Sequence, residues 1–181
     1  MVLFVYVDNS NVWIEGQRLS AVRRGMAANA REAMKLGVVD REWRYDFGRL
    51  YDIACPDGAS VGRSILFGSR PPANDTLWER ARKDGFEVVV FDRNAANREK
   101  RVDTALTTTL MEDSFKFMQA DRGDVAVIIA GDGDYVPVVE SLRQRGLQTR
   151  VVFWDHATSR DLKQLVDYQP LDPYLDHLAI P

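Results

Sequence analysis

The sequence predicts an α/β protein, a three-layer α/β/α sandwich in which helices cover both faces of a mainly parallel, five-stranded sheet. Apolar runs without polar alternation recur along the chain, which is typical of strands buried on both faces of a parallel sheet. Amphipathic stretches separate these runs, and this alternation indicates βαβ units with right-handed crossovers. A chain of 181 residues with 45% hydrophobic and 28% charged residues has the composition of a globular protein.

Five apolar runs are predicted as strands. The first covers residues 2–7, is rich in β-branched side chains and stops at Asp8. We expect this strand to lie in the centre of a doubly wound sheet, with the strand order reversing beside it. The later runs have the same character and cover residues 64–67, 86–91, 125–130 and 148–154.

Seven stretches between and after these runs are predicted as helices. In residues 40–54 the side chains of Trp43, Phe47, Leu50 and Tyr51 are spaced for one face of a helix. Glycine follows several of the stretches, as it often does at helix ends. The predicted helices cover residues 11–24, 27–36, 40–54, 74–83, 102–118, 136–145 and 159–166.

We expect one domain over residues 1–169, followed by an irregular tail over residues 170–181. The helical stretch at about 21–54 is longer than a crossover between neighbouring strands needs, so it is interpreted as an insertion. The sequence is compatible with three roles for this insertion: a lid, a contact in a homodimer, or simple packing. Substrate specificity is one property that this insertion would carry.

The net charge and the single cysteine indicate which binding partners and which cellular compartment to expect. The formal net charge of −3 gives no global field toward nucleic acid or an anionic membrane, so any RNA must meet a local basic surface. Cys55 is the single cysteine, which excludes an internal disulfide and fits a reducing compartment. The apolar run at the amino terminus is too short for a signal peptide or a membrane span. These features favour a soluble, cytoplasmic protein without a membrane partner.

Four aspartates occupy the positions where such sheets bind ligands. Asp8 follows the first strand, Asp132 and Asp134 follow the fourth, and Asp103 opens the long helix before the fourth strand. Any one of them is readily explained as a helix cap or turn residue. Together they would meet at the carboxyl ends of the strands, where hard cations prefer carboxylate oxygens. The set therefore predicts a Mg²⁺ or Mn²⁺ site that activates water for phosphodiester cleavage.

Several side chains near these acids are candidates for holding substrate. Asn11 fits two compatible roles, as the N-cap of the first helix and as an amide that orients a metal-bound water or a phosphate. Residues 93–101 read RNAANREKR, and we expect Lys100 or Arg101 to contact the phosphate. Three further arginines on the first helix would extend this basic surface: Arg18, Arg23 and Arg24.

Aromatic side chains beside the acids have two interpretations. Trp13 and Tyr135 are either core residues or platforms on which an unpaired base stacks. The other three tryptophans, at positions 43, 78 and 154, are expected to pack in the core, and no role is assigned to His156 or His177.

Three motifs give the chain a specific resemblance. Residues 8–11 read DNSN, residues 100–103 read KRVD, and residues 131–135 read GDGDY, followed by Pro137 and Gly146. In this order they resemble the NYN family, which belongs to the PIN-like nuclease group and includes the bacterial LabA-like proteins. The resemblance implies a PIN-like variant of the Rossmann-like topology, Mg²⁺ or Mn²⁺ dependence and hydrolysis of RNA.

The resemblance also assigns roles to individual residues. Asp8, Asp103 and Asp132 match the acidic positions of the family, Asp134 matches the second acid of its Gly-Asp-x-Asp segment, and Lys100 recurs in its motif. The chain departs from the pattern where the family often carries another aspartate, here residues 107–109 (TTT), and where it favours serine, here Ala130. Both departures remove candidate ligands or hydrogen-bonding groups.

Other functions fit the sequence less well. The departures support a degenerate PIN-like module that binds RNA or a protein without cleaving it. Asp8-x-Ser10 also begins a von Willebrand A-type adhesion motif, but Val12 at its third ligand position cannot coordinate a metal. A dinucleotide site would need G-x-G-x-x-G after the first strand, and the chain has DNSNVW there.

Overall fold

The computed structural model describes residues 1–70, 76–92 and 98–180, except for the side chains of residues 70, 92 and 98–101. Six strands of the described chain form one sheet in the order β3-β2-β1-β4-β5-β6, and every neighbouring pair is parallel. The strands are β1 (Leu3–Asp8), β2 (Val61–Arg70), β3 (Glu87–Asp92), β4 (Val125–Ile129), β5 (Gln148–Phe153) and β6 (Asp167–Pro170).

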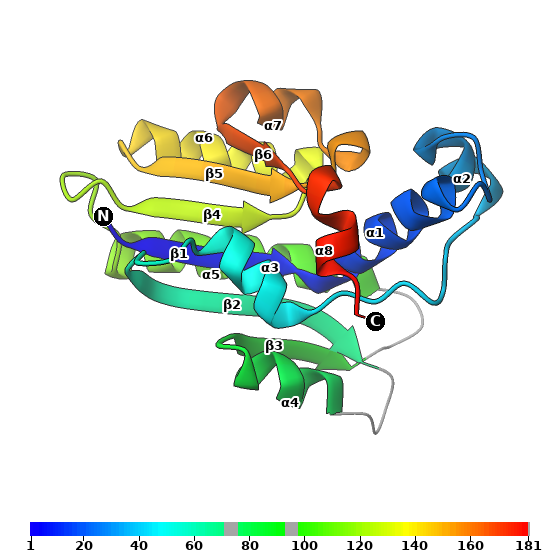
Figure 1. Ribbon diagram of the computed structural model, residues 1–181. Coiled ribbons are helices and arrows are strands. Elements are labelled where there is room, and N and C mark those ends of the chain that lie inside the picture. The colour runs from blue at the N-terminus through cyan, green and yellow to red at the C-terminus, as the bar shows by residue number, and fades with distance from the viewer. Residues whose placement is uncertain (71–75, 93–97, 181) are drawn as a thin grey trace.

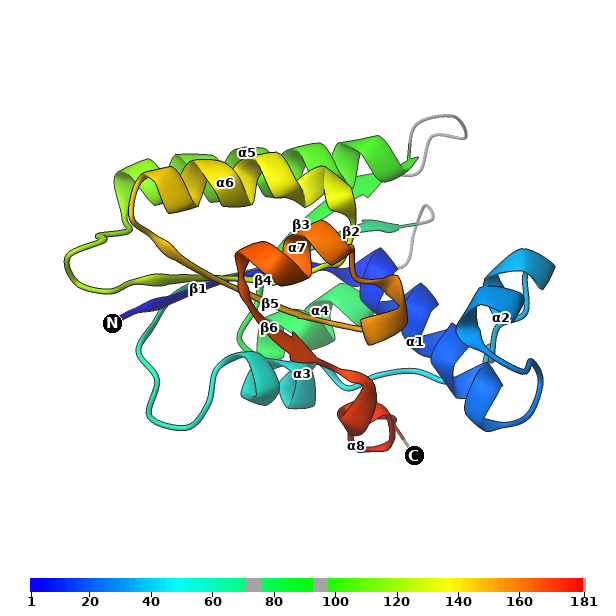
Figure 2. The same ribbon diagram turned by 90° about the horizontal axis from the view of Figure 1, so that it is seen from above.

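Helices cover both faces of this sheet, as Figure 2 shows from above. The helices α5, α6 and α7 lie over one face, and α3, α4 and α8 lie over the other, while α1 and α2 project beyond the strand ends. The helices are α1 (Asn9–Arg23), α2 (Ala30–Leu36), α3 (Phe47–Ala54), α4 (Thr76–Lys83), α5 (Arg98–Lys116), α6 (Val136–Gln144), α7 (Arg160–Leu165) and α8 (Leu175–Leu178). Three single 3₁₀ turns accompany them, η1 (Gly133–Tyr135), η2 (Asp155–Ala157) and η3 (Asp172–Tyr174).

The two central strands form the middle of the core. Every residue of β1 and β4 is buried, because helices cover both of their faces, and this explains why both runs lack polar alternation. They pair in register from Leu3 with Val125 to Val7 with Ile129. The chain leaves β1 toward β2 on one side, and β4 continues toward β5 on the other. The order therefore reverses between β1 and β4, whose carboxyl ends lie side by side (Figure 1). Sheets of this kind bind ligands at such a switch point.

The predicted α/β/α sandwich is confirmed, but the sheet has six strands rather than five. The sixth strand, β6, pairs with β5 at the edge of the sheet. Its sequence, DYQP, carries no apolar run because an edge strand is only partly buried. The segment expected as an irregular tail also forms regular structure, and it packs through three buried leucines, Leu171, Leu175 and Leu178.

The predicted helix over residues 40–54 is wrong in its first half. Helix α3 begins only at Phe47, where the side chain of Asp46 caps it by accepting a hydrogen bond from Arg49 N. The preceding residues run along α1 instead, and the ring of Trp43 packs against Gly16 and Trp154. A side chain at Gly16 would collide with the Trp43 ring, so this glycine lets the returning chain approach α1. Tertiary packing thus overrides the helical spacing.

The described helices give no sign of a membrane-spanning segment. None of them is both long enough and apolar enough to cross a bilayer.

Candidate functional site

Asp8 is the last residue of β1 and also the N-cap of α1. One of its carboxylate oxygens accepts from Asn11 N at 3.0 Å, and the other accepts from Asn11 Nδ2 at 2.8 Å. The expectation that Asn11 caps the helix is therefore wrong, because Asn11 lies inside the first turn and its amide holds the capping carboxylate. Asp8 is only 2% exposed, and these two hydrogen bonds from Asn11 orient its carboxylate.

Asp103, in the first turns of α5, meets Asp8 at the hydroxyl of Tyr135. The Tyr135 oxygen lies 3.1 Å from Asp103 Oδ1 and 3.4 Å from Asp8 Oδ2. Tyr135 is fully buried in η1, directly after β4. Its ring therefore offers no platform for a base, and its hydroxyl faces the carboxylates. Trp13, the other aromatic candidate, is half-buried and packs against the core.

Burial and like charge make this pair of carboxylates costly in the absence of a cation. Burial first, and then the neighbouring Asp103, raise the pKa of Asp8 to about 7, against the hydrogen bonds from the Asn11 and Ser10 backbone. The pKa of Tyr135 is also raised, first by burial and then by the two carboxylates, so its hydroxyl keeps its proton and remains a donor. A perturbed acid pair of this kind marks a candidate functional site.

Asp132 and Asp134 lie beside the Asp8–Asp103 pair and do not join it. Both are exposed, and Asp132 caps η1 by accepting from Asp134 N at 3.2 Å. Within the described residues no three acidic, histidine or cysteine side chains converge closely enough to hold a metal ion. Asp132 nevertheless lines a cavity together with Asn11, the residue that holds Asp8. The sequence predicted all four aspartates at one end of the sheet. In the structure two of them, Asp8 and Asp103, meet at the Tyr135 hydroxyl.

The structure describes only part of the predicted basic surface. The loop at 93–97 and the side chains of Lys100 and Arg101 lie outside the described residues. The three arginines of α1 and its C-terminal cap are engaged with carboxylates: Arg18 with Glu15, Arg23 with Asp176, and Arg24 with Asp40 and Glu42. They therefore do not extend a free basic patch.

Two positions that depart from the family pattern, Thr107 and Ala130, supply no further ligand. The hydroxyl of Thr107 donates back to the helix, to Asp103 O at 2.8 Å and Thr104 O at 3.0 Å. Ala130 is fully buried at the end of β4. Asp113, further along α5, belongs to a different part of the molecule.

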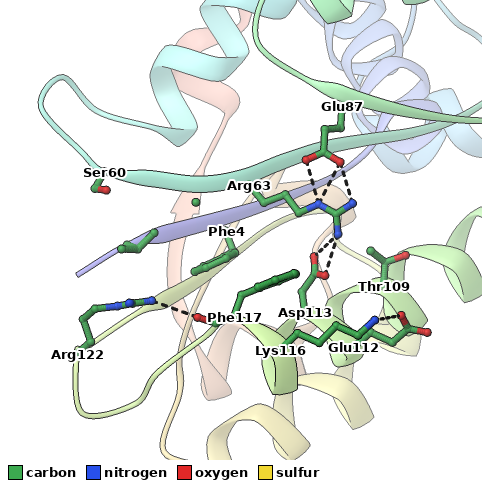
Figure 3. A pocket seen from close by; sticks show the side chains of 12 residues that line it. Phe4, Ser60, Arg63, Glu87, Thr109, Glu112, Asp113, Lys116, Phe117 and Arg122 are labelled. Carbon is green, nitrogen blue, oxygen red and sulfur yellow. Dashed lines mark hydrogen bonds and ion pairs between the residues drawn. The ribbon is translucent and has the colours of Figure 1, made fainter.

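That part is a larger cavity of about 920 Å³ at the amino-terminal ends of β1, β2 and β3, shown in Figure 3. Arg63 lies between Glu87 and Asp113 there, donating to both carboxylates, and Tyr6 donates to Asp113 at 2.9 Å. Lys116 pairs with Glu112 on its rim. Each of these positive charges is paired with a carboxylate, and the cavity lies at the opposite end of the strands from Asp8. It is therefore separate from the acid pair.

Sequence reasoning missed two residues beside the acids, Glu15 and His156. His156 Nε2 lies 3.1 Å from Glu15 Oε2, and both side chains line the cavity that contains Asn11 and Asp132. The helical repeat could have indicated Glu15, because positions 11, 15 and 18 share one face of α1. His156 lies in η2, just beyond the carboxyl end of β5, where ligands are expected.

The side chains at this crevice suit a hard divalent cation. Asp8 and Asp103 present carboxylate oxygens, which Mg²⁺ and Mn²⁺ prefer. The Asn11 amide holds Asp8 in place, as partners of ligating carboxylates commonly do. A cation would also neutralise the buried charge that raises the pKa of Asp8.

Comparisons with known proteins agree with this arrangement. A family model described as the NYN domain matches residues 9–172. A crystal structure of a protein of unknown function from Vibrio parahaemolyticus has the same fold, with a TM-score of 0.67 and 20% sequence identity. The similarity covers 98% of this chain and 95% of that one. No match was found among curated proteins.

Proposed function

Because the chain belongs to the NYN domain family, which is a family of PIN-like nucleases, we propose that it is a metal-dependent ribonuclease that hydrolyses RNA phosphodiester bonds. One observation carries the proposal: Asp8 and Asp103 meet at the Tyr135 hydroxyl, at the carboxyl end of β1 beside the β1–β4 switch point. A buried carboxylate beside a second, half-buried one destabilises a fold, so this pair at a ligand-binding crevice favours a role in binding cations.

Mg²⁺ or Mn²⁺ would be held by Asp8 and Asp103, with Asp132 as the third ligand and Asp134 in support. Asp132 is exposed on the turn after β4, where its carboxylate caps η1. When bound, the ion supplies an activated water and neutralises charge that develops on the phosphate. These assignments rest on the chemistry of the carboxylates and on the family motifs.

The remaining residues position these groups. Asn11 holds one Asp8 oxygen through its amide, and the Tyr135 hydroxyl keeps Asp103 close to Asp8. Asp8 must release its proton before it can bind a cation, and its raised pKa makes that release dependent on pH near neutrality. Lys100 and Arg101 are proposed to contact the phosphate, as their place directly before Asp103 in the sequence suggests.

The test is a cleavage assay with labelled single-stranded RNA, structured RNA and single-stranded DNA in Mn²⁺, Mg²⁺ or EDTA. An Asp8→Asn variant, purified identically, controls for contaminating nuclease. We expect RNA cleavage that needs a divalent cation and disappears in the variant. Cleavage that survives in Asp8→Asn, or that proceeds in EDTA, would rule out this assignment.

Two observations favour a second function. Asp132 and Asp134 do not converge with the Asp8–Asp103 pair, and the Thr107 hydroxyl is directed to the helix backbone. An incomplete ligand set would leave a module that binds RNA or a protein without cleaving it. Metal-dependent RNA binding without cleavage in the same assay would support this function.

A further inference from the structure

The sheet ends in two edge strands, β3 and β6, which lie at opposite sides of the sheet in Figure 1. An edge strand presents backbone N–H and C=O groups that no neighbouring strand satisfies, and proteins usually protect such edges. Strand β6 is protected, because it has only four residues and ends in Pro170, which has no N–H to offer. Strand β3 has six residues, EVVVFD, and contains no proline. The chain therefore protects one edge of its sheet in a way that it does not protect the other.

The backbone of β3 is open on its outer side. Strand β3 pairs with β2 along its whole length, from Glu87 to Asp92, and the pairing is parallel. In such a pair, alternate residues direct their N–H and C=O groups to the neighbouring strand, and the residues between them direct theirs away from it. Apart from β2, no described segment makes a backbone hydrogen bond to residues 87–92. The outward backbone groups of β3 are therefore available to a further strand.

The side chains in the middle of β3 are apolar and only half-buried. Val88, Val89, Val90 and Phe91 pack against the core, and each keeps part of its surface accessible. Every residue of the central strands β1 and β4, by contrast, is buried. A run of half-buried apolar residues along an open edge is the kind of surface that another strand covers. A partner strand would therefore bury apolar surface as well as satisfy the backbone.

The acidic residues at the two ends of β3 restrict which strand can pair with it. Like charges that lie directly opposite each other destabilise a pair of strands, so a partner must not place an acid against Glu87 or Asp92. Arg63 donates to both carboxylate oxygens of Glu87, at 3.0 Å to Oε1 and 2.8 Å to Oε2. The charge at the start of β3 is therefore already balanced within the chain.

A second copy of β3 meets this restriction. Two copies related by a twofold axis perpendicular to the sheet pair antiparallel, and each face of the sheet continues into the same face of the other copy. Residues opposite each other are then both odd-numbered or both even-numbered, because successive side chains alternate between the faces. Glu87 and Asp92 differ in this respect, so they do not lie opposite each other. The strand is thus complementary to its own copy.

We propose that β3 is a dimerisation edge, at which a second copy of this chain pairs antiparallel with the first. The sheet then continues through both copies, and the outward N–H and C=O groups of the two strands satisfy each other. Two registers bring the apolar residues together, one centred on Val89 and the other on Val90. Because β1 and β3 run in the same direction, the two Asp8–Asp103 crevices open at opposite ends of the dimer.

The first test measures the mass of the protein by sedimentation velocity across a concentration series, in EDTA and without RNA. We expect a dimer that dissociates on dilution. Val89→Lys or Val90→Lys, whichever lies on the axis, should raise its dissociation constant about tenfold or more, because two ammonium groups then lie opposite each other. Gln169→Lys places the same charge on the other edge strand and should leave the dimer unchanged. A monomer at every concentration, or a dimer that both valine variants leave intact, would overturn the proposal.

The second test uses Val89→Cys and Val90→Cys, which keep a small apolar side chain and so preserve the fold. In an antiparallel pair, the Cβ atoms of opposite residues lie about 4.5–5.5 Å apart, so a residue on the axis comes close enough to its own copy for a disulfide. The native Cys55 is buried and does not compete. We expect mild oxidation to link the copies in one of these variants, and much less in the other and in the edge control Gln169→Cys.

Equal linking in all three cysteine variants, or linking in none of them, would overturn the proposal. Neither test involves a metal or RNA, so both are separate from the proposed ribonuclease function. A protein that forms this dimer and cuts no RNA would retain the dimerisation edge and lose the nuclease assignment. A monomer that cuts RNA would do the reverse.

Discussion

The hydroxyl of Tyr135 lies 3.1 Å from Oδ1 of Asp103, which joins the turn after β4 to the first turns of α5. The same oxygen lies 3.4 Å from Oδ2 of Asp8. A phenol has one proton to donate, so it satisfies one carboxylate at a time and holds the second beside the same atom. Tyr135 thus sets the separation of two like charges that would otherwise move apart.

Replacing Tyr135 by phenylalanine keeps the buried ring and removes only the hydroxyl. We expect the dissociation constant for Mn²⁺, measured by titration calorimetry, to rise about tenfold, as it commonly does when a partner of a ligating side chain is lost. Tyr174→Phe is the control, because Tyr174 lies in the C-terminal segment away from the acid pair. Unchanged Mn²⁺ affinity in Tyr135→Phe would show that the hydroxyl plays no part in arranging the carboxylates.

Metal affinity should depend on pH through Asp8. Its pKa is about 7, raised first by burial and then by Asp103, and a bound cation must displace the proton. The apparent affinity for Mn²⁺ should therefore fall about tenfold for each unit of pH below 7 and level off above it. A titration series from about pH 5.5 to 8.5 measures this slope. Affinity that stays level across the whole range would mean that Asp8 is not a ligand.

The metal-free fold should lose stability as the pH rises. The unfolded carboxyl of Asp8 releases its proton near pH 3.8, whereas the folded one retains it to about pH 7. Between these values the folded state binds more protons, so the free energy of unfolding falls with rising pH and then stays low. Asp8→Asn removes the buried charge and can still cap α1, because asparagine is as good an N-cap as aspartate.

We therefore expect Asp8→Asn to be more stable than wild type at pH 8 by about 2 kcal/mol, part of the free energy that its pKa shift represents. Urea denaturation in EDTA is the measurement, and the difference should vanish near pH 4. A variant that is less stable than wild type at pH 8 would indicate that the ionised carboxylate stabilises the metal-free fold.

Gly131 should tolerate no side chain. A Cβ at this position would lie 2.3 Å from Phe153 Cδ1 and 2.6 Å from Ala157 O, which is a backbone atom that cannot move aside. We expect Gly131→Ala to lower the free energy of unfolding by about 1–3 kcal/mol. In Gly133→Ala the new atom would meet Ser159 Oγ at 3.6 Å, an ordinary contact, so little change is expected. Equal urea midpoints for the two variants would contradict the packing described here.

The Arg63–Asp113 pair should matter for stability and not for the acid site. Asp113 is 2% exposed and accepts from both Arg63 and Tyr6, so Asp113→Asn weakens a buried network and should cost about 1–3 kcal/mol of stability. Glu112→Gln, on an exposed pair with Lys116, is the control and should change little. Mn²⁺ affinity should equal that of wild type in both variants, and a loss of affinity in Asp113→Asn would connect the two ends of the sheet.

Patterns within a few residues explain the part of the fold that the sequence predicted. Strands buried on both faces must be apolar throughout, so β1 and β4 could be recognised directly, and the aspartates after them were placed at the right end of the sheet. The edge strand β6 was missed because its partly exposed residues need no such pattern. The helical spacing of residues 40–46 was misleading, since contacts of Trp43 with Gly16 and Trp154 outweigh a local preference.

The sequence by itself determined the sandwich, its central strands and the family motifs, because periodicity and sequence order are local properties of the chain. Only the tertiary structure decided which polar groups meet. The hydroxyl of Tyr135 reaches Asp8 and Asp103, and Glu15 meets His156, because strand order and helix packing bring distant segments to one crevice. No spacing along the chain encodes these contacts, since each depends on register and crossover geometry across the whole sheet.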